Sequence, residues 1–270
     1  MRIARFAAGD EVSYGLVGTA RAGRKASGGE IIAELAGHPF GGGSDGIRLT
    51  GTTCPLADVR LLAPVLPSKV IGFVPPGAER PERAEDGLDA GSVMYLKPST
   101  AVCGPSDAIS YPAQAHRLGA DGKLAVIIGR LCRQVPPDQA AAVIFGYACA
   151  LDVTAADLQD SDRQWTRAKG FDTFCPLGPW IETDVVPGDV ALVTSVNGRV
   201  RHASIPRAGQ GVAALIAAAS SVMTLLPGDV LLAGGAGGAG GAADELDRGD
   251  EVSVSIDGVG TLTNKVEKGD

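Results

Sequence analysis

Four charged side chains stand in apolar stretches of the chain, where proton transfer and stabilisation of negative charge are the chemistry to expect. Asp121 and Lys123 open the segment GADGKLAVIIGR, Asp152 follows FGYACAL, and Lys169 lies in TRAKGFDTFCPLGPWI. Residues two apart on a strand share a face, so Asp121 and Lys123 point the same way. A carboxylate there is costly unless it meets a cation, a metal or N–H donors, and the two lysines are the candidate cations. These four residues are the predicted catalytic set.

The segment LAGGAGGAGGAAD contains a formal G-x-G-x-x-G match directly after a predicted strand. A nucleotide site also needs a following helix and a second parallel strand, whereas a charged turn and a hairpin follow here. Nucleotide binding is therefore not predicted, but Gly234 and Gly235 can offer backbone N–H groups to a small ligand. His116, close in sequence to the charged strand, is a further candidate substrate-binding residue, although a surface histidine is the simpler interpretation.

The elements that position these residues are predicted to be mostly strands, because the chain holds 38 glycines and 17 prolines and few aromatic residues. Segments such as SVMYLKP, KLAVIIGR with its unbroken apolar run, and DVLLAG predict strands, and Asn197-Gly198 and Asp257-Gly258 predict hairpin turns. Helices are expected at about 138–150 and 211–223. A proline-bracketed link predicts a small domain over residues 1–65 and a larger one over 66–270. The charged segment 72–90 is expected to be a surface loop and a candidate lid.

Composition excludes several classes of function. The net charge is −7 and the basic residues are scattered, which offers no footprint for nucleic acid. The N-terminus lacks the apolar segment of a signal peptide, and the apolar run at 211–226 is too short for a membrane span, so a cytoplasmic protein that acts on a small molecule is expected. Five widely spaced cysteines predict neither a disulfide framework nor a zinc cluster. Cys175 could be a nucleophile, but a packed thiol is favoured.

The segments KLAVIIGR, FGYACALDVTAADLQD, RAKGFDTFCPLGPWI, VNGRVRHA and SVMTLLPGDVLLAGGAGGAG together resemble the fumarylacetoacetate hydrolase family. The segment MYLKPSTAVCGPSDAI also matches, and its Lys97 becomes a candidate substrate-binding residue. The resemblance implies an α+β, mostly β fold: a mixed β-roll domain with few short helices after a small N-terminal α+β domain. It also implies a homodimer and a divalent ion that chelates an oxo-acid substrate.

The catalytic pattern that this resemblance implies is damaged here. The family's metal-binding Glu-x-Glu pair falls on Asp121-Gly122-Lys123, and of its three acids only Asp152 is intact. The loop that carries the family's base falls on VPPGAERPE, without histidine at the matching place, and its substrate-holding Thr-Gly-Thr falls on AGG at 233–235. The position at which the family has an arginine after its third acid is Ala156 here, whereas the family's lysine is retained as Lys169. Two acids and the two lysines sum to zero charge, so we expect Lys123 to stand in place of the ion, with no cofactor.

Three functions remain open at this stage. The first is an enzyme, expected in bacterial specialised metabolism, that carries out a metal-independent rearrangement, cyclisation or lyase step on an oxo or enol compound. The second is an ordinary hydrolase, decarboxylase or isomerase of oxo acids that depends on Mg²⁺ or Mn²⁺, with Asp121 and Asp152 as remaining ligands. The third is a non-catalytic binding protein in which Lys123 forms a structural salt bridge.

Overall fold

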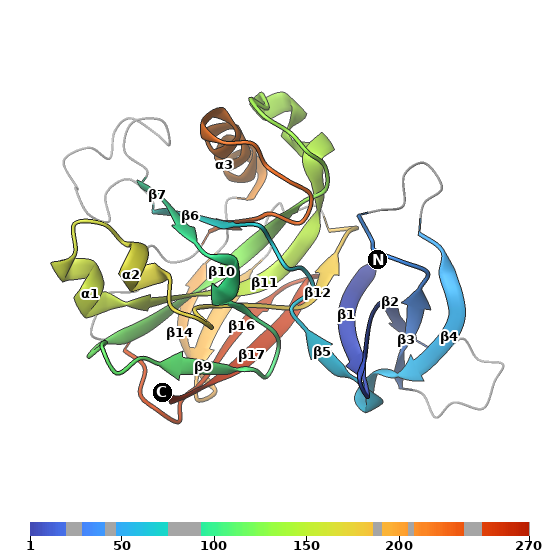
Figure 1. The fold of residues 1–270 in the computed structure, drawn as a ribbon, viewed down its shortest axis with the longest axis horizontal. Helices are drawn as coiled ribbons and strands as arrows, with labels where there is room; N and C mark the ends of the chain where they lie inside the picture. Colours follow the sequence, from blue (N-terminus) through green and yellow to red (C-terminus); the bar gives the residue numbers. More distant parts are fainter. Residues whose placement is uncertain are drawn as a thin grey trace.

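The computed structural model describes residues 1–19, 29–40, 47–74, 93–185, 191–204, 208–234 and 245–269. These residues form two β-sheets and a few helical segments, as expected for a mostly β protein (Figure 1). The helices are α1 (Ala156–Ser161), α2 (Thr166–Lys169) and α3 (Ala208–Val222), with 3-10 turns at Leu56–Asp58, Ser99–Ala101 and Pro137–Val143.

The larger sheet has twelve strands among the described residues and runs through the whole molecule. Its order is β4 (Leu49–Pro55), β3 (Glu30–Leu35), β2 (Glu11–Thr19), β1 (Arg2–Ala8), β12 (Cys175–Glu182), β11 (Ile144–Ala155), β10 (Leu118–Ile128), β15 (Val230–Ala233), β6 (Val70–Val74) and β7 (Val93–Lys97). In addition, β5 (Arg60–Leu62) pairs with β1, and β8 (Val102–Cys103) pairs with β12.

The smaller sheet packs against the centre of the larger one. Its order is β14 (Arg199–Ser204), β13 (Leu192–Val196), β16 (Glu251–Ile256), β17 (Gly260–Lys268) and β9 (Ala108–Tyr111). Gly122 of β10 lies at this contact: its N–H donates to Thr194 Oγ1 at 3.2 Å, and a Cβ on Gly122 would overlap Thr194 and Val254. The opposite face of β10 is thus the one that carries Asp121 and Lys123.

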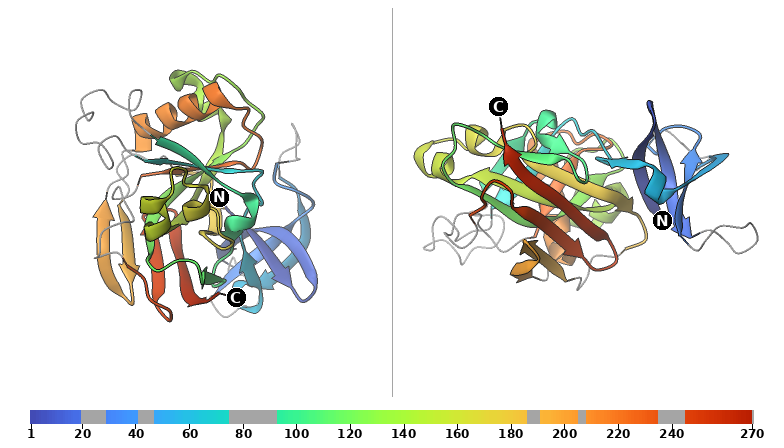
Figure 2. Two further views of the ribbon diagram at one scale, coloured as in Figure 1. Left: turned by 60° about the vertical axis from the view of Figure 1, so that its left-hand side comes forward. Right: turned by 90° about the horizontal axis from the view of Figure 1, so that it is seen from below.

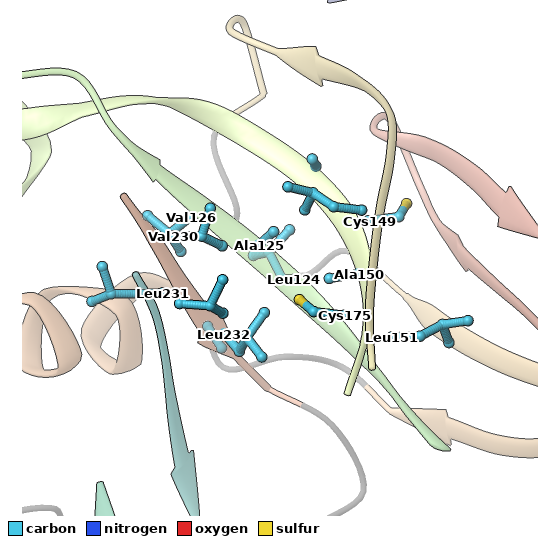
Figure 3. Packing of buried hydrophobic residues seen from close by; sticks show 14 of the residues in the cluster. Leu124, Ala125, Val126, Cys149, Ala150, Leu151, Cys175, Val230, Leu231 and Leu232 are labelled. Carbon is cyan, nitrogen blue, oxygen red and sulfur yellow. The ribbon is translucent and has the colours of Figure 1, made fainter. Parts of the chain in front are cut away.

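The core is built around β10 and β11, whose long apolar runs are buried on both faces, as central strands of a covered sheet must be. Figure 3 shows Val126 of β10 close to Val230 and Leu231 of β15, and Leu124 close to Ala150 of β11. Helix α3 contacts β15 and lies above the sheet in Figure 1. The charged residues Asp121, Lys123 and Asp152 lie within these two strands.

The helix expected at about 138–150 is wrong. A 3-10 turn covers Pro137–Val143, and the apolar run that follows it forms strand β11. A run without a 3.6-residue period serves equally as a helix or as a buried strand, and pairing with β10 on one side and β12 on the other decides in favour of the strand. The second expected helix is confirmed as α3.

Both predicted hairpins are confirmed. Asn197 and Gly198 have φ of 51° and 71° between β13 and β14, the left-handed pair that a tight hairpin turn requires. Gly258 has φ of 73° in the turn between β16 and β17. Of the candidate lid, residues 75–90 lie outside the described part of the chain.

The N-terminal strands extend the main sheet. In β1, Arg2 and Ile3 pair with Glu182 and Ile181 of β12, so the blue strands at the right of Figure 1 continue the central sheet. Figure 2 shows the same arrangement from two further sides. The described part of residues 1–65 is built of strands, with the turn at Leu56–Asp58 as its helical element. The boundary at residue 65 stays a prediction.

Among the described residues, no helix has the length and apolar character needed to cross a membrane.

Candidate active site

Three strands and one helix bring seven polar side chains together, and we call this set the lysine cluster. Each strand contributes two residues that are two positions apart and therefore share a face, and α2 contributes its last residue. The members are Asp121 and Lys123 of β10, Asp152 and Thr154 of β11, Tyr95 and Lys97 of β7, and Lys169 of α2.

These side chains lie close together because the large sheet curls back on itself. Strand β7 stands at the end of the sheet order, yet the Nζ of Lys97 donates to the carbonyl oxygen of Val153 on β11 at 2.8 Å. Helix α2 packs against both β7 and β11. The sheet therefore folds back so that β7 and α2 cover one face of the central strands at the left of Figure 1.

Asp152 lies at the centre of the inner part of the lysine cluster and is almost fully buried. Lys97 Nζ lies 2.9 Å from its Oδ1, Lys169 Nζ lies 2.8 Å from its Oδ2, and Tyr95 donates its hydroxyl to Oδ2. The Nζ of Lys169 also donates to Thr154 Oγ1 at 2.7 Å and stands over the Tyr95 ring, 4.6 Å from its centre. Two ammonium groups thus share one carboxylate in a buried environment.

Asp121 and Lys123 form the outer part of the lysine cluster. Lys123 Nζ lies 2.7 Å from Asp121 Oδ2 and donates to the carbonyl oxygen of Gly234 at 2.7 Å. Gly234 is exposed, whereas Asp121 and Lys123 are themselves buried. Asp121 and Asp152 are direct cross-strand partners, which places the inner and outer parts side by side.

Burial and the neighbouring charges set the protonation of the inner groups. Burial alone would raise the pKa of Asp152, but the ammonium groups of Lys169 and Lys97 hold it well below its usual range. Burial lowers the pKa of Lys169 to about 8, opposed by Asp152 and assisted by the ammonium of Lys97. Burial and the Asp152 charge raise the pKa of Tyr95. At neutral pH, Asp152 is a fixed anion, and Lys169 is the member that can exchange a proton.

The four predicted catalytic residues are indeed brought together, but their pairing differs from the expectation. Lys123 contacts Asp121 and not both carboxylates, and Lys97 supplies a third ammonium that the charge count omitted. Lys97 is fully buried, and its Nζ donates to the carbonyl oxygens of Val153, Lys169 and Phe174. Its geometry is that of a structural cation behind Asp152, and a contact with substrate stays a prediction.

Among the described residues, the remaining candidates add no side chain to the lysine cluster. His116 is exposed, and its backbone N–H donates to Asp157 Oδ2 at 3.0 Å. Gly235 lies outside the described residues, whereas Gly234 is the acceptor for Lys123. Cys175 is buried, and burial raises the pKa of its thiol to about 12, which agrees with a packed thiol.

Sequence reasoning missed Tyr95 and Thr154. The signal that could have found them is the period of two along a strand: Tyr95 precedes Lys97 by two residues, and Thr154 follows Asp152 by two. Gly72 of β6 pairs with Tyr95, and a Cβ at this position would overlap the phenol ring. The absence of a side chain at Gly72 therefore makes room for the ring.

The described residues do not fit a divalent ion. Mg²⁺ and Mn²⁺ require several oxygen ligands, but the carboxylates of Asp121 and Asp152 already face ammonium groups. Within the described part of the chain, no group of three or more His, Cys, Asp or Glu residues could hold a metal. An ion here would meet the nearby charges of Lys123 and Lys169.

A cavity of about 900 Å³ borders the lysine cluster. It is lined by Tyr95 and Lys97 of the cluster, by Trp165, Thr166 and Gly170 around Lys169, and by Arg163, Ser68, Lys69, Val93, Met94, Leu96, Pro98, Gln164 and Met223. The Trp165 ring meets the Tyr95 ring edge-on at 5.8 Å. The volume is that of a small-molecule site, and its charged lining residues are all cationic.

Comparisons with known proteins give a consistent relationship over the whole chain. Residues 77–267 match the sequence model of the fumarylacetoacetate (FAA) hydrolase C-terminal domain, and residues 1–64 match that of an Rv2993c-like N-terminal domain. The crystal structure of 5-carboxymethyl-2-hydroxymuconate delta-isomerase from Mycobacterium smegmatis superimposes with a TM-score of 0.84 at 44% sequence identity, over 99% of this chain and 100% of the isomerase.

Two further relatives differ in the chemistry that their names state. The mitochondrial oxaloacetate tautomerase Fahd2a of Rattus norvegicus is 34% identical over 223 residues, which are 78% of this chain and 71% of the tautomerase. Maleylpyruvate hydrolase from Sphingobium sp. SYK-6, solved with manganese(II) and pyruvate, has a TM-score of 0.73 at 30% identity and covers 100% of both chains.

Proposed function

The chain belongs to the fumarylacetoacetate hydrolase family, and from that premise we propose that it is an enzyme that rearranges a small oxo or enol acid by proton transfer without a divalent ion. The relatives named as a delta-isomerase and a tautomerase support proton transfer over hydrolysis. One observation supports a reaction without a divalent ion: both carboxylates, Asp121 and Asp152, are paired with lysine ammonium groups.

In this proposal the outer part of the lysine cluster stabilises negative charge and the inner part transfers the proton. Negative charge develops on the carbonyl oxygen when a proton leaves the neighbouring carbon, and the buried ammonium of Lys123 can stabilise that enolate. Lys169, whose pKa is lowered to about 8, can take and return the proton. Asp152 remains anionic and orients Lys169, so Lys169 is the proton carrier in this proposal and Asp152 is not.

The test is proton exchange on a small oxo acid. Pyruvate and oxaloacetate in D₂O, followed by NMR, report exchange at the carbon next to the carbonyl, and each reaction runs with EDTA or with added Mn²⁺. We expect exchange that EDTA leaves unchanged, and a loss of about 10²- to 10³-fold in Lys123→Met, the cost of removing one preorganised oxyanion donor. The exposed Lys265→Met is the matched control and should keep its rate.

Two other outcomes assign the protein to the alternative functions. Exchange or hydrolysis that disappears with EDTA and returns with Mn²⁺ would establish the metal-dependent reading, which the manganese complex of the related hydrolase favours. A lack of turnover on every oxo acid, together with saturable binding of one, would establish a binding protein. The cytoplasmic location and the homodimer stay predictions, which fractionation and sedimentation can check.

A further inference from the structure

The cavity of about 900 Å³ extends away from the lysine cluster along the last strand of the large sheet. Six consecutive residues of β7, 93–98, line it, together with the segment 163–166 that leads into α2. Strand β7 ends the sheet order, so one edge of it has no partner strand in the part of the chain that the structure describes. Side chains from both faces of β7 therefore reach the cavity. Lys123 and Lys169 do not line it, so a ligand held here need not contact either lysine.

The charges of the cavity lining leave one cation available. The charged lining residues are Lys69, Lys97 and Arg163, and no Asp or Glu among the described residues lines the cavity. Lys69 forms an ion pair with Asp229, and Lys97 forms one with Asp152. Arg163 is exposed and forms no ion pair with another described residue. Its guanidinium is therefore the group in the lining that can bind an incoming anion.

The apolar part of the same lining is open to water. Val93 and Leu96 are large apolar residues with exposed fractions of 41% and 47%, although most side chains of this kind in the central strands are buried. Met94, Met223 and Trp165 are half-buried. Large apolar side chains gathered around a cavity and left in contact with water are typical of a ligand site.

From this lining we propose that the cavity binds a small aromatic carboxylic acid, with its carboxylate on Arg163 and its ring against Trp165. A guanidinium offers two parallel N–H donors to a carboxylate, and a single unpaired cation matches a monoanion. An indole packs well against a second ring, and the thioethers of Met94 and Met223 make favourable contacts with aromatic groups. The proposal goes beyond the function proposed above, because it requires binding and no reaction.

The test is a titration of the full chain with 3-phenylpropionate, followed by calorimetry. Two matched ligands separate the two parts of the recognition: 3-phenylpropionamide lacks the negative charge, and acetate lacks the ring. We expect saturable binding of one 3-phenylpropionate per chain. Each matched ligand should bind at least about tenfold more weakly, because it loses either the charged hydrogen bonds or the apolar contact.

Two variants locate the bound acid in the cavity. Arg163→Gln removes the guanidinium, and Leu96→Asp adds a carboxylate to the lining, so each should weaken binding of 3-phenylpropionate by about tenfold or more. Both positions are exposed, so we expect both variants to fold. Arg199→Gln is the matched control, since Arg199 is exposed on β14 of the smaller sheet and does not line the cavity. It should keep the wild-type affinity.

The contrary outcomes are equally definite. A wild-type chain that shows no saturable binding of 3-phenylpropionate would overturn the proposal, whatever the variants do. Equal affinity for the acid and its amide, or an affinity that Arg163→Gln leaves unchanged, would overturn the role of Arg163 and with it the class of ligand. Calorimetry measures binding and not turnover, so the outcome is independent of proton exchange on oxo acids, and either proposal can fail without the other.

Discussion

At the scale of single residues, Lys97 is the member of the lysine cluster whose loss should cost most stability. Its ammonium donates to three carbonyl oxygens and forms an ion pair with Oδ1 of Asp152 in the fully buried interior. Lys97→Met should therefore lower the free energy of unfolding by about 3–5 kcal/mol, because it leaves a buried carboxylate partly unpaired. Urea denaturation at pH 7 measures this. Lys265→Met, at an exposed position, should stay within about 0.5 kcal/mol of wild type, and equal costs would contradict the assignment.

Lys123 is the residue whose replacement should create a metal site. Lys123→Glu puts a third carboxylate beside Asp121 and Asp152 and reverses the local charge. We expect Mn²⁺ binding at least about tenfold tighter than in wild type, equal to about 1.4 kcal/mol, measured by calorimetry or by the EPR signal of free Mn²⁺. Lys123→Gln removes the ammonium without adding a ligand charge and should bind weakly. Tight Mn²⁺ binding by wild type would show that the lysine does not exclude the ion.

Lys169 should make stability depend on alkaline pH. Its pKa is about 8 in the folded protein and 10.5 as the ordinary value, because burial and Lys97 outweigh Asp152. Between these values the unfolded chain binds more protons at this residue, so the free energy of unfolding rises with pH by at most about 1.4 kcal/mol per unit. The difference between wild type and Lys169→Met should increase from pH 8 to 10 in urea denaturation. A difference that stays flat would mean that the folded protein does not lower this pKa.

At the scale of elements, the contact between β6 and β7 controls the orientation of Asp152. The Tyr95 ring of β7 covers Gly72 of β6 and carries the hydroxyl that donates to Asp152. Gly72→Ala should displace the ring and cost about 1.5–3 kcal/mol, the range for a hydrogen bond to a charged group. Gly18→Ala in β2 is the matched control, since a Cβ there meets nothing within 4 Å.

A double-mutant cycle checks the mechanism of that cost. In a Tyr95→Ala background the added methyl group has no ring to displace, so the cost of Gly72→Ala should largely disappear. An undiminished cost would place the effect in the backbone of β6.

Much of this arrangement could be predicted from the chain. Alternating segments marked β7, β13 and β16, and the positions of Asp121 and Lys123 on one strand predicted their contact. The nature of β11 could not be predicted, because a buried strand and a buried helix share an unbroken apolar run. The role of Lys97 was also hidden: its partners are carbonyl oxygens far away in sequence, and only the curl of the sheet brings β7 over β11.

At the scale of the whole molecule, the continuous large sheet should make the N-terminal strands unfold together with the central strands. Ile3 of β1 and Ile181 of β12 are cross-strand partners and are fully buried, so unfolding of the N-terminal strands would expose the centre of the large sheet. A single cooperative transition is expected in calorimetry. Ile3→Ala should lower its free energy by about 2–5 kcal/mol without splitting it.

Trp165 offers a local probe of this coupling, because it lies at the lysine cluster and far in sequence from β1. In a Trp180→Phe background it is the sole tryptophan of the chain. Its fluorescence should report the same lowered midpoint for Ile3→Ala that calorimetry gives, whereas Val12→Ala on the exposed side of β2 should leave the midpoint nearly unchanged. If Ile3→Ala leaves the midpoint of the Trp165 fluorescence transition unchanged, residues 1–65 unfold independently. The sheet would then join two units without making their stabilities depend on each other.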